Sequence, residues 1–89
     1  MYTFRGRPVI LSLDAIKNQR NRGVDQALLE RILEDGEDYR DTKTARGEIG
    51  RAIRRGRFLV FAKIVPYIGE TGEEEAWLVK HIGVVRRER

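Results

Sequence analysis

The spacing of hydrophobic residues changes at Gly36 and divides the chain into a helical part and a strand part. Before this glycine, the leucines and isoleucines of residues 28–33 recur along one side of a helix. After it, apolar and polar residues alternate with a period of two, as in strands that bury one face. The strands that this alternation predicts span residues 47–55, 57–66 and 76–85.

The first predicted helix follows a short apolar strand at residues 9–11. Ser12 or Asp14 can cap it, because a side-chain oxygen at this position accepts a hydrogen bond from the free N–H groups of the first turn. We expect Leu13 and Ile16 to lie on the buried side of this helix, since they are three residues apart.

The connection between the two helices is predicted at Gly23, which suits the left-handed conformation that often ends a helix. Asp25 is the predicted N-cap of the second helix. Val24 before the cap and Leu29 four residues after it have the spacing of a hydrophobic staple. Gly36 is the predicted end of this helix, so the two helices form a short hairpin.

The strand part is predicted to fold as an antiparallel meander. A polar edge strand around Tyr39 is expected at residues 37–45, and the Arg-Gly dipeptide at 55–56 is typical of a tight hairpin turn. The order of elements predicts an α+β fold, with the two-helix hairpin packed on one face of a roughly four-stranded antiparallel sheet. A single domain over residues 1–89 is expected, with a charged tail at 86–89.

Pairing the strands through the predicted turn gives the sheet two unlike faces. One face is nearly all apolar and is expected to lie against the helices; it carries Ile49, Ile53, Phe58, Val60, Ala62, Ile64, Trp77, Val79 and His81. The other mixes apolar and cationic side chains, whereas a solvated sheet face is normally polar. We therefore expect this second face to be an interface. Its predicted members are Ala52, Leu59, Phe61, Val65, Leu78, Ile82 and Val84, with Arg54, Arg57, Lys63 and Lys80.

The composition limits how the protein can be stabilised and where we expect it to act. The chain has 89 residues, a net charge of +4 and no cysteine, so neither a disulfide nor a thiolate metal site can stabilise it. Arginine supplies 14 of the 18 cationic residues, which suits phosphate binding but also the surface ion pairs of a thermophile. No apolar run is long enough to cross a membrane or to act as a signal peptide, so we expect a cytoplasmic protein without a membrane partner.

The helical part carries a short motif that resembles a known family. Ser12, Asp14-Ala15, Asn18 and Arg22-Gly23-Val24 resemble the pattern S-x-HA-x-x-R-x-x-x-RG-[IV] of a small family of domains of unknown function related to RelE/BrnT-type toxins. The order of elements from residue 9 to about 85 is also similar. This chain departs from the pattern twice, because Asp14 replaces a histidine and Asn18 replaces an arginine.

The resemblance implies a RelE-like fold and a metal-independent mRNA endonuclease. Such chemistry needs a base for the ribose 2′-OH, an acid for the leaving oxygen and cations on the phosphate. The residues that this chain offers for catalysis are His81, Lys80 and Arg54, and those for nucleic-acid binding are Arg54, Arg57, Phe61, Lys63 and Lys80. We expect neither a metal nor a cofactor, since the adjacent carboxylates Glu73, Glu74 and Glu75 fit a solvated hairpin tip.

Each of these residues also has a structural interpretation. His81 fits a strand histidine packed against its neighbours, and Lys63 fits a cross-strand pair with Glu48. Phe61 fits the core of a protein interface as well as a platform for a nucleic-acid base.

Three functional hypotheses therefore stay open. In the first hypothesis, the chain is a toxin-like protein that binds mRNA and, in its active form, cleaves it on or off the ribosome. Alternatively, it is a catalytically degenerate relative that serves as a homodimeric interaction module or contacts an antitoxin-like protein through the outer sheet face. The third hypothesis is a basic nucleic-acid-binding domain without turnover.

Overall fold

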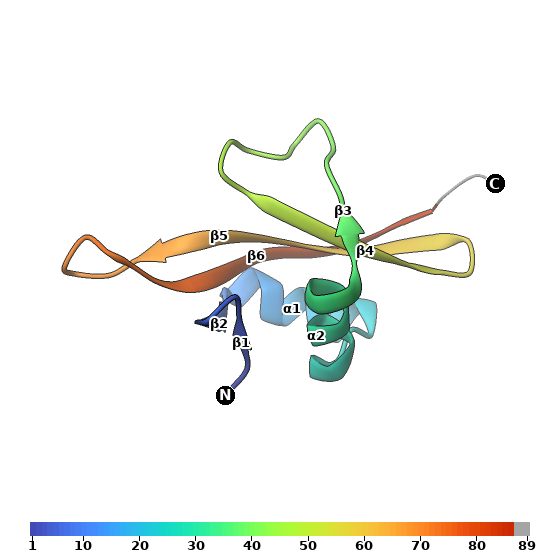
Figure 1. Cartoon of the computed structure of the whole chain (residues 1–89). Helices are drawn as coiled ribbons and strands as arrows, with labels where there is room; N and C mark the ends of the chain where they lie inside the picture. The colour runs from blue at the N-terminus through green and yellow to red at the C-terminus, as the bar shows by residue number, and fades with distance from the viewer. Residues whose placement is uncertain (87–89) are drawn as a thin grey trace.

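A computed structural model describes residues 1–86, which form two helices and six strands (Figure 1). A short hairpin of β1 and β2 comes first, two helices follow, and the long strands complete the fold. The elements are β1 (Thr3–Phe4), β2 (Arg7–Leu11), α1 (Leu13–Arg22), α2 (Gln26–Asp35), β3 (Glu37–Asp38), β4 (Ile49–Arg55), β5 (Phe58–Ile68) and β6 (Glu74–Arg86). Arg86 therefore belongs to β6, and the rest of the predicted tail lies outside the described residues.

The strands form one curled, mixed sheet in the order β1-β2-β6-β5-β4-β3. The chain is an α+β protein with helices on one sheet face, as predicted, but the prediction of a roughly four-stranded antiparallel sheet was wrong. Strand β2 pairs in parallel with β6, since the chain crosses through both helices and the meander between them. The edge strand expected at 37–45 shrinks to the two residues of β3, because residues 39–48 leave the sheet plane.

Local signals determined the helix ends. The Ser12 hydroxyl accepts a hydrogen bond from the Ala15 N–H at 3.0 Å, and the Asp25 carboxylate accepts one from the Leu28 N–H at 2.8 Å. Gly23 follows α1 in the left-handed conformation at φ 68°. Both cap predictions and the Gly23 prediction are therefore confirmed.

The core lies between the helices and one face of the sheet. Helix α2 supplies its four buried residues, all from the predicted stripe at 28–33. The prediction for α1 was wrong, because Leu13 and Ile16 keep 78% and 42% of their surface exposed while Ala15 is fully buried. Strands contribute Val60, Ala62, Ile64, Trp77, Val79 and Ile82 to the core.

The strand register confirms one predicted set of faces up to Val79 and reverses it beyond that residue. Ile64 pairs with Val79, but Lys63 pairs with His81, so β6 contains one extra residue at this point. Such a bulge shifts every later side chain of the strand to the other face. Consequently Ile82 and Val84, predicted on the outer face, pack with the helices, and His81, predicted against the helices, is exposed.

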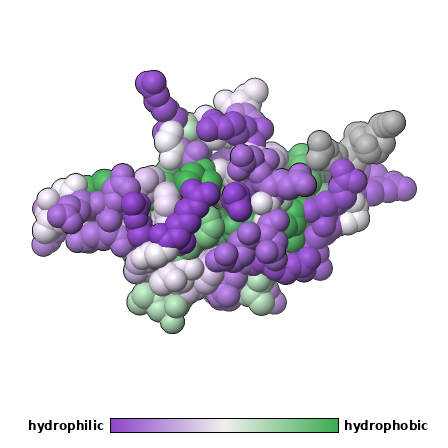
Figure 2. Space-filling view, in the orientation of Figure 1, coloured by the Kyte–Doolittle hydropathy of each residue, from purple (hydrophilic) through white to green (hydrophobic). Residues whose placement is uncertain are grey.

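The molecule is elongated, with principal extents of 46 × 26 × 22 Å. The free end of the β5–β6 hairpin projects beyond the helices (Figure 1). Residues 39–48 rise from the side of the sheet that faces away from the helices (Figure 1). Hydrophilic residues cover most of the visible surface, with hydrophobic ones emerging in patches (Figure 2). Neither helix in residues 1–86 combines the length and the apolar character that a membrane span requires.

Candidate functional site

The bulge in β6 places Lys80 and His81 together on the outer face, the side of the sheet away from the helices. Regular alternation would point two successive side chains to opposite faces. Because Lys80 is the extra residue, both side chains line the same hollow with Phe61 and Lys63 of β5. Four of the predicted site residues are thus brought together.

Ser12 and helix α1 supply polar groups that contact β6 next to the bulge. The Asn18 side-chain oxygen accepts a hydrogen bond from the Ile82 N–H at 3.1 Å. The Ser12 N–H donates to the Val79 carbonyl at 3.1 Å, and the Ser12 hydroxyl lies 3.4 Å from the Lys80 carbonyl. The Ser12 bond completes the parallel pairing of β2 with β6. Beyond the end of β2, the Asn18 oxygen satisfies the Ile82 N–H, which would otherwise lack a partner. Ser12 and Asn18 are both positions of the family-like motif.

Phe61 forms the floor of the hollow. Its ring stacks on Tyr39 with centroids 4.5 Å apart and an interplanar angle of 16°, and it lies 5.5 Å from the His81 ring. Gly83 pairs with Phe61 across the sheet, and a Cβ at Gly83 would collide with the phenyl ring. The ring can lie flat on β6 only because residue 83 is glycine.

Residues 39–48, which we call the strap, cover part of the outer face beside Phe61. Asp41 shapes the strap by accepting hydrogen bonds from the Lys43 N–H at 3.0 Å and the Thr44 hydroxyl at 3.1 Å. Gly50 lets the strap return to β4, since a Cβ there would collide with the Tyr39 carbonyl. The strap is therefore a defined turn on the sheet.

Two ion pairs attach the strap to the strands. Lys63, only 5% exposed, meets Asp41 at 2.7 Å, and Lys80 meets Glu48, 7% exposed, at 3.3 Å. The predicted Glu48–Lys63 pair is therefore wrong, because the strap brings a different carboxylate to each lysine. Lys63 is buried and already paired, so it positions the strap and is a poor ligand for phosphate.

The ion pairs also shift the acidity of their carboxyl groups. The hydrogen bond from Lys63 is the main reason that the pKa of Asp41 falls from 3.8 to about 2. Burial alone would raise the pKa of Glu48, but the hydrogen bond from the Ala45 N–H and the contact with Lys80 outweigh burial and lower it. Both carboxylates therefore stay ionised at neutral pH.

The hollow has a volume of about 520 Å³ and an excess of positive charge. Its lining includes the cations Arg22, Lys43, Lys63 and Lys80 and the carboxylates Asp41 and Glu48, so four positive charges face two negative ones. Arg22 comes from the last turn of α1, and both Arg22 and Lys43 are exposed. Within residues 1–86, no ion pair engages either of them, so they are free to meet an anion.

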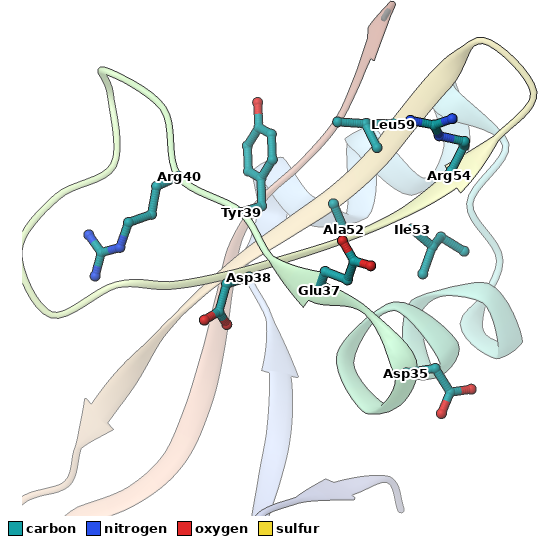
Figure 3. A pocket seen from close by; sticks show the side chains of 9 residues that line it. All are labelled: Asp35, Glu37, Asp38, Tyr39, Arg40, Ala52, Ile53, Arg54 and Leu59. Carbon is teal, nitrogen blue, oxygen red and sulfur yellow. The ribbon is translucent and has the colours of Figure 1, made fainter.

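Arg54 lies in a second hollow, of about 670 Å³, on the far side of Tyr39. Figure 3 shows Arg54 beside Leu59, its partner across the strands, with Glu37 and Asp38 of β3 also on the lining. Arg57 lies in the β4–β5 turn and lines neither hollow. Arg54 and Arg57 are therefore separated from His81 and Lys80.

Sequence reasoning missed Arg22 and Lys43 as members of the hollow. Arg22 was interpreted as part of a helix end and a turn, and it is both of these and a lining residue. Lys43 lies on the strap, whose return over the sheet depends on long-range contacts. A signal for the bulge was present, since two polar residues at 80 and 81 separate the core residues Val79 and Ile82.

Comparison with known proteins gives no neighbour for this chain: no family model, no curated protein and no solved structure matches it. The resemblance to RelE/BrnT-type toxins stays a prediction from the motif and the order of elements.

Proposed function

We propose that this protein is a RelE/BrnT toxin-like RNA-binding protein whose outer-face hollow receives a single RNA strand. The observation that carries the proposal is the meeting of Lys80, His81, Arg22 and an aromatic floor in one cationic hollow. Cations that hold phosphates beside an aromatic ring that stacks on a base are the usual elements of single-strand recognition.

Each part of the hollow has a role in this proposal. Arg22 and Lys43 bind phosphate, and Lys80, whose side chain is 49% exposed, reaches the same phosphate while keeping its contact with Glu48. Phe61 is already stacked on Tyr39, so a base meets the edge of this pair or takes the place of the tyrosine. Lys63 and Asp41 fix the strap that forms the rim.

Cleavage would follow from the position of His81. An imidazole that is exposed beside bound phosphate can take the proton of the ribose 2′-OH, whose oxygen then attacks the adjacent phosphorus. The bond to the 5′-oxygen breaks, and this oxygen takes up a proton from water. Lys80 would stabilise the charge that develops on the phosphate. Arg54, predicted as a third catalytic residue, has no part in this arrangement because it lines the other hollow.

RNA binding is tested with a short fluorescein-labelled single-stranded RNA, read by fluorescence anisotropy over a range of salt concentrations. Arg22→Ala and Lys80→Ala should each weaken binding roughly tenfold, as expected for a charge-assisted contact. Each should also reduce the slope of log K against log salt by about 0.7. Lys17→Ala is the matched control, since Lys17 is exposed on α1 and lines neither hollow.

Binding that is absent, or that Lys17→Ala weakens as much as Lys80→Ala, contradicts the proposal. Cleavage is tested separately by incubating end-labelled mRNA with the protein, with and without translating ribosomes. A 2′,3′-cyclic phosphate product that disappears with 2′-deoxy substrate and falls about 10²–10⁴-fold in His81→Gln supports His81 as the base. Binding without any cleavage identifies the chain as a catalytically degenerate relative.

A further inference from the structure

The arm formed by the free end of the β5–β6 hairpin carries an apolar outer face that nothing in residues 1–86 covers completely (Figure 1). Ile10, Leu78 and Val65 pair across β2, β6 and β5 and form one row. On the same face, Ile10 and Tyr67 keep 44% and 46% of their surface exposed. Exposed apolar groups gathered on one sheet face are typical of an interaction site.

Opposite charges lie on the two sides of this apolar row. The hairpin tip is acidic and the strap is cationic, and all of the side chains concerned are exposed. Glu74 is paired with Arg7, and the strap carboxylates Asp41 and Glu48 are paired with lysines of the strands. Within residues 1–86, no ion pair engages the other charges of the tip and the strap. The free tip carboxylates are Glu70, Glu73 and Glu75, and the free strap cations are Arg40, Lys43 and Arg46.

The strap and the acidic tip lie on opposite sides of the row along β5. Phe61, under the strap, is four residues from Val65, or about 13 Å at about 3.3 Å per residue. In the other direction β5 continues to Ile68, three residues or about 10 Å from Val65, and the acidic tip follows. A two-fold axis through the row would therefore place the tip of one copy beside the strap of the other.

We propose that the outer face binds a second copy of this chain about such an axis, with the apolar rows in contact and each acidic tip against the partner's strap. The match is self-complementary, as a closed two-fold dimer requires, because the charge contact forms twice. The strap, which rises on one half of the face, comes to lie over the bare arm of the partner. A dimer of standard size takes about 800 Å² from each copy, roughly an eighth of the 6220 Å² of accessible surface.

This arrangement also adds residues to the candidate site. Glu70 and Glu73 of the partner subunit would lie beside Lys43 and the cationic hollow, where they compete with phosphate. This consequence, unlike the dimer itself, rests on the proposed function. RNA binding and dimerisation would then oppose each other.

The experiment is a charge exchange read by analytical ultracentrifugation. One variant reverses the tip (Glu70→Lys with Glu73→Lys) and the other reverses the strap (Lys43→Glu with Arg46→Glu). All four positions are exposed, so both variants should fold, and circular dichroism checks this. The wild-type chain should sediment at about twice its 10.3 kDa, and each variant alone should be at least tenfold weaker as a dimer.

Mixing the two variants is the decisive step. Each tip then meets a strap of opposite charge, so the mixture should form a dimer although neither variant does so alone. A monomeric wild-type chain, a mixture that stays monomeric, or a mixture that grows beyond a dimer overturns the two-fold arrangement.

The coupling to RNA is read separately by anisotropy, where the tip variant should bind RNA several-fold more tightly than wild type at concentrations that form the dimer. If a monomeric tip variant binds RNA no more tightly than wild type, the proposed competition between the partner's tip and RNA is wrong. Complete absence of RNA binding by every protein would refute the proposed function and leave the dimer result standing.

Discussion

Removal of the Asn18 amide tests whether α1 holds the bulge in β6. The Asn18 oxygen is the acceptor for the Ile82 N–H at 3.1 Å, and the Ile82 side chain is fully buried. In Asn18→Ala this N–H loses its partner, which costs about 1–3 kcal/mol when no other acceptor replaces it. Alanine is the better helix former and returns about 0.6 kcal/mol in α1.

The net effect expected for Asn18→Ala is a loss of about 1.5 kcal/mol from the free energy of unfolding. For a domain of this size, such a loss lowers Tm by roughly 6–12 °C. Thermal and urea denaturation followed by circular dichroism measure the change. Exchange of the Ile82 amide proton, followed by NMR, should become faster because the hydrogen bond is gone.

Two variants serve as controls. Asn18→Asp keeps a side-chain oxygen acceptor and should stay close to wild type. Asn21→Ala, at an exposed position of the same helix, removes an asparagine away from the bulge and should be neutral or slightly stabilising. If Asn18→Ala is no less stable than Asn21→Ala and leaves exchange at Ile82 unchanged, α1 does not hold the bulge through this contact.

The ion pair of the strap should make it acid-sensitive. Because the pKa of Asp41 is lowered from 3.8 to about 2, its contribution to stability is complete above about pH 4 and disappears as the pH falls toward 2. Tyr39 ring protons followed by NMR should report loss of the stack on Phe61 in this pH window. The Asp41→Asn variant should lack the transition. An identical transition in that variant would show that Asp41 is not the group responsible. Gly83→Ala adds a Cβ that collides with the Phe61 ring, so it should lower stability by about 1–3 kcal/mol and shift the Tyr39 resonances. Unchanged resonances would show that the ring does not need the glycine.

The caps and the helix stripe could be predicted from the sequence because their causes are local. A Ser or Asp side chain reaches the N–H three residues ahead whatever the rest of the fold does, as at Ser12 and Asp25. Gly23 likewise needs only its own backbone conformation. The buried side of α1 was harder to predict. This helix packs beside β6 through Ala15 and through polar contacts, so its larger apolar residues do not lie on its buried side.

The candidate site was less predictable because it depends on contacts between distant parts of the chain. Residue types alone indicated Phe61, Lys63, Lys80 and His81, and these four do share a hollow. Their roles depend on the strap, whose Asp41 pairs with a lysine 22 residues away. The pattern of residues 39–48 does not predict that contact. The sequence alone therefore could not show that Lys63 is buried and paired.

The bulge at Lys80 is not needed for the core, and this makes a role in the site the better explanation for it. Without Lys80, the sequence from Val79 to Ile82 would alternate regularly, with both of these residues still facing the helices and His81 still facing outward. The extra residue interrupts the ladder between β5 and β6, as a bulge does. What the extra residue adds is a second outward side chain next to His81, a cation beside an imidazole. Bulges concentrate where a strand re-aims side chains toward a site, and the arrangement here matches that use.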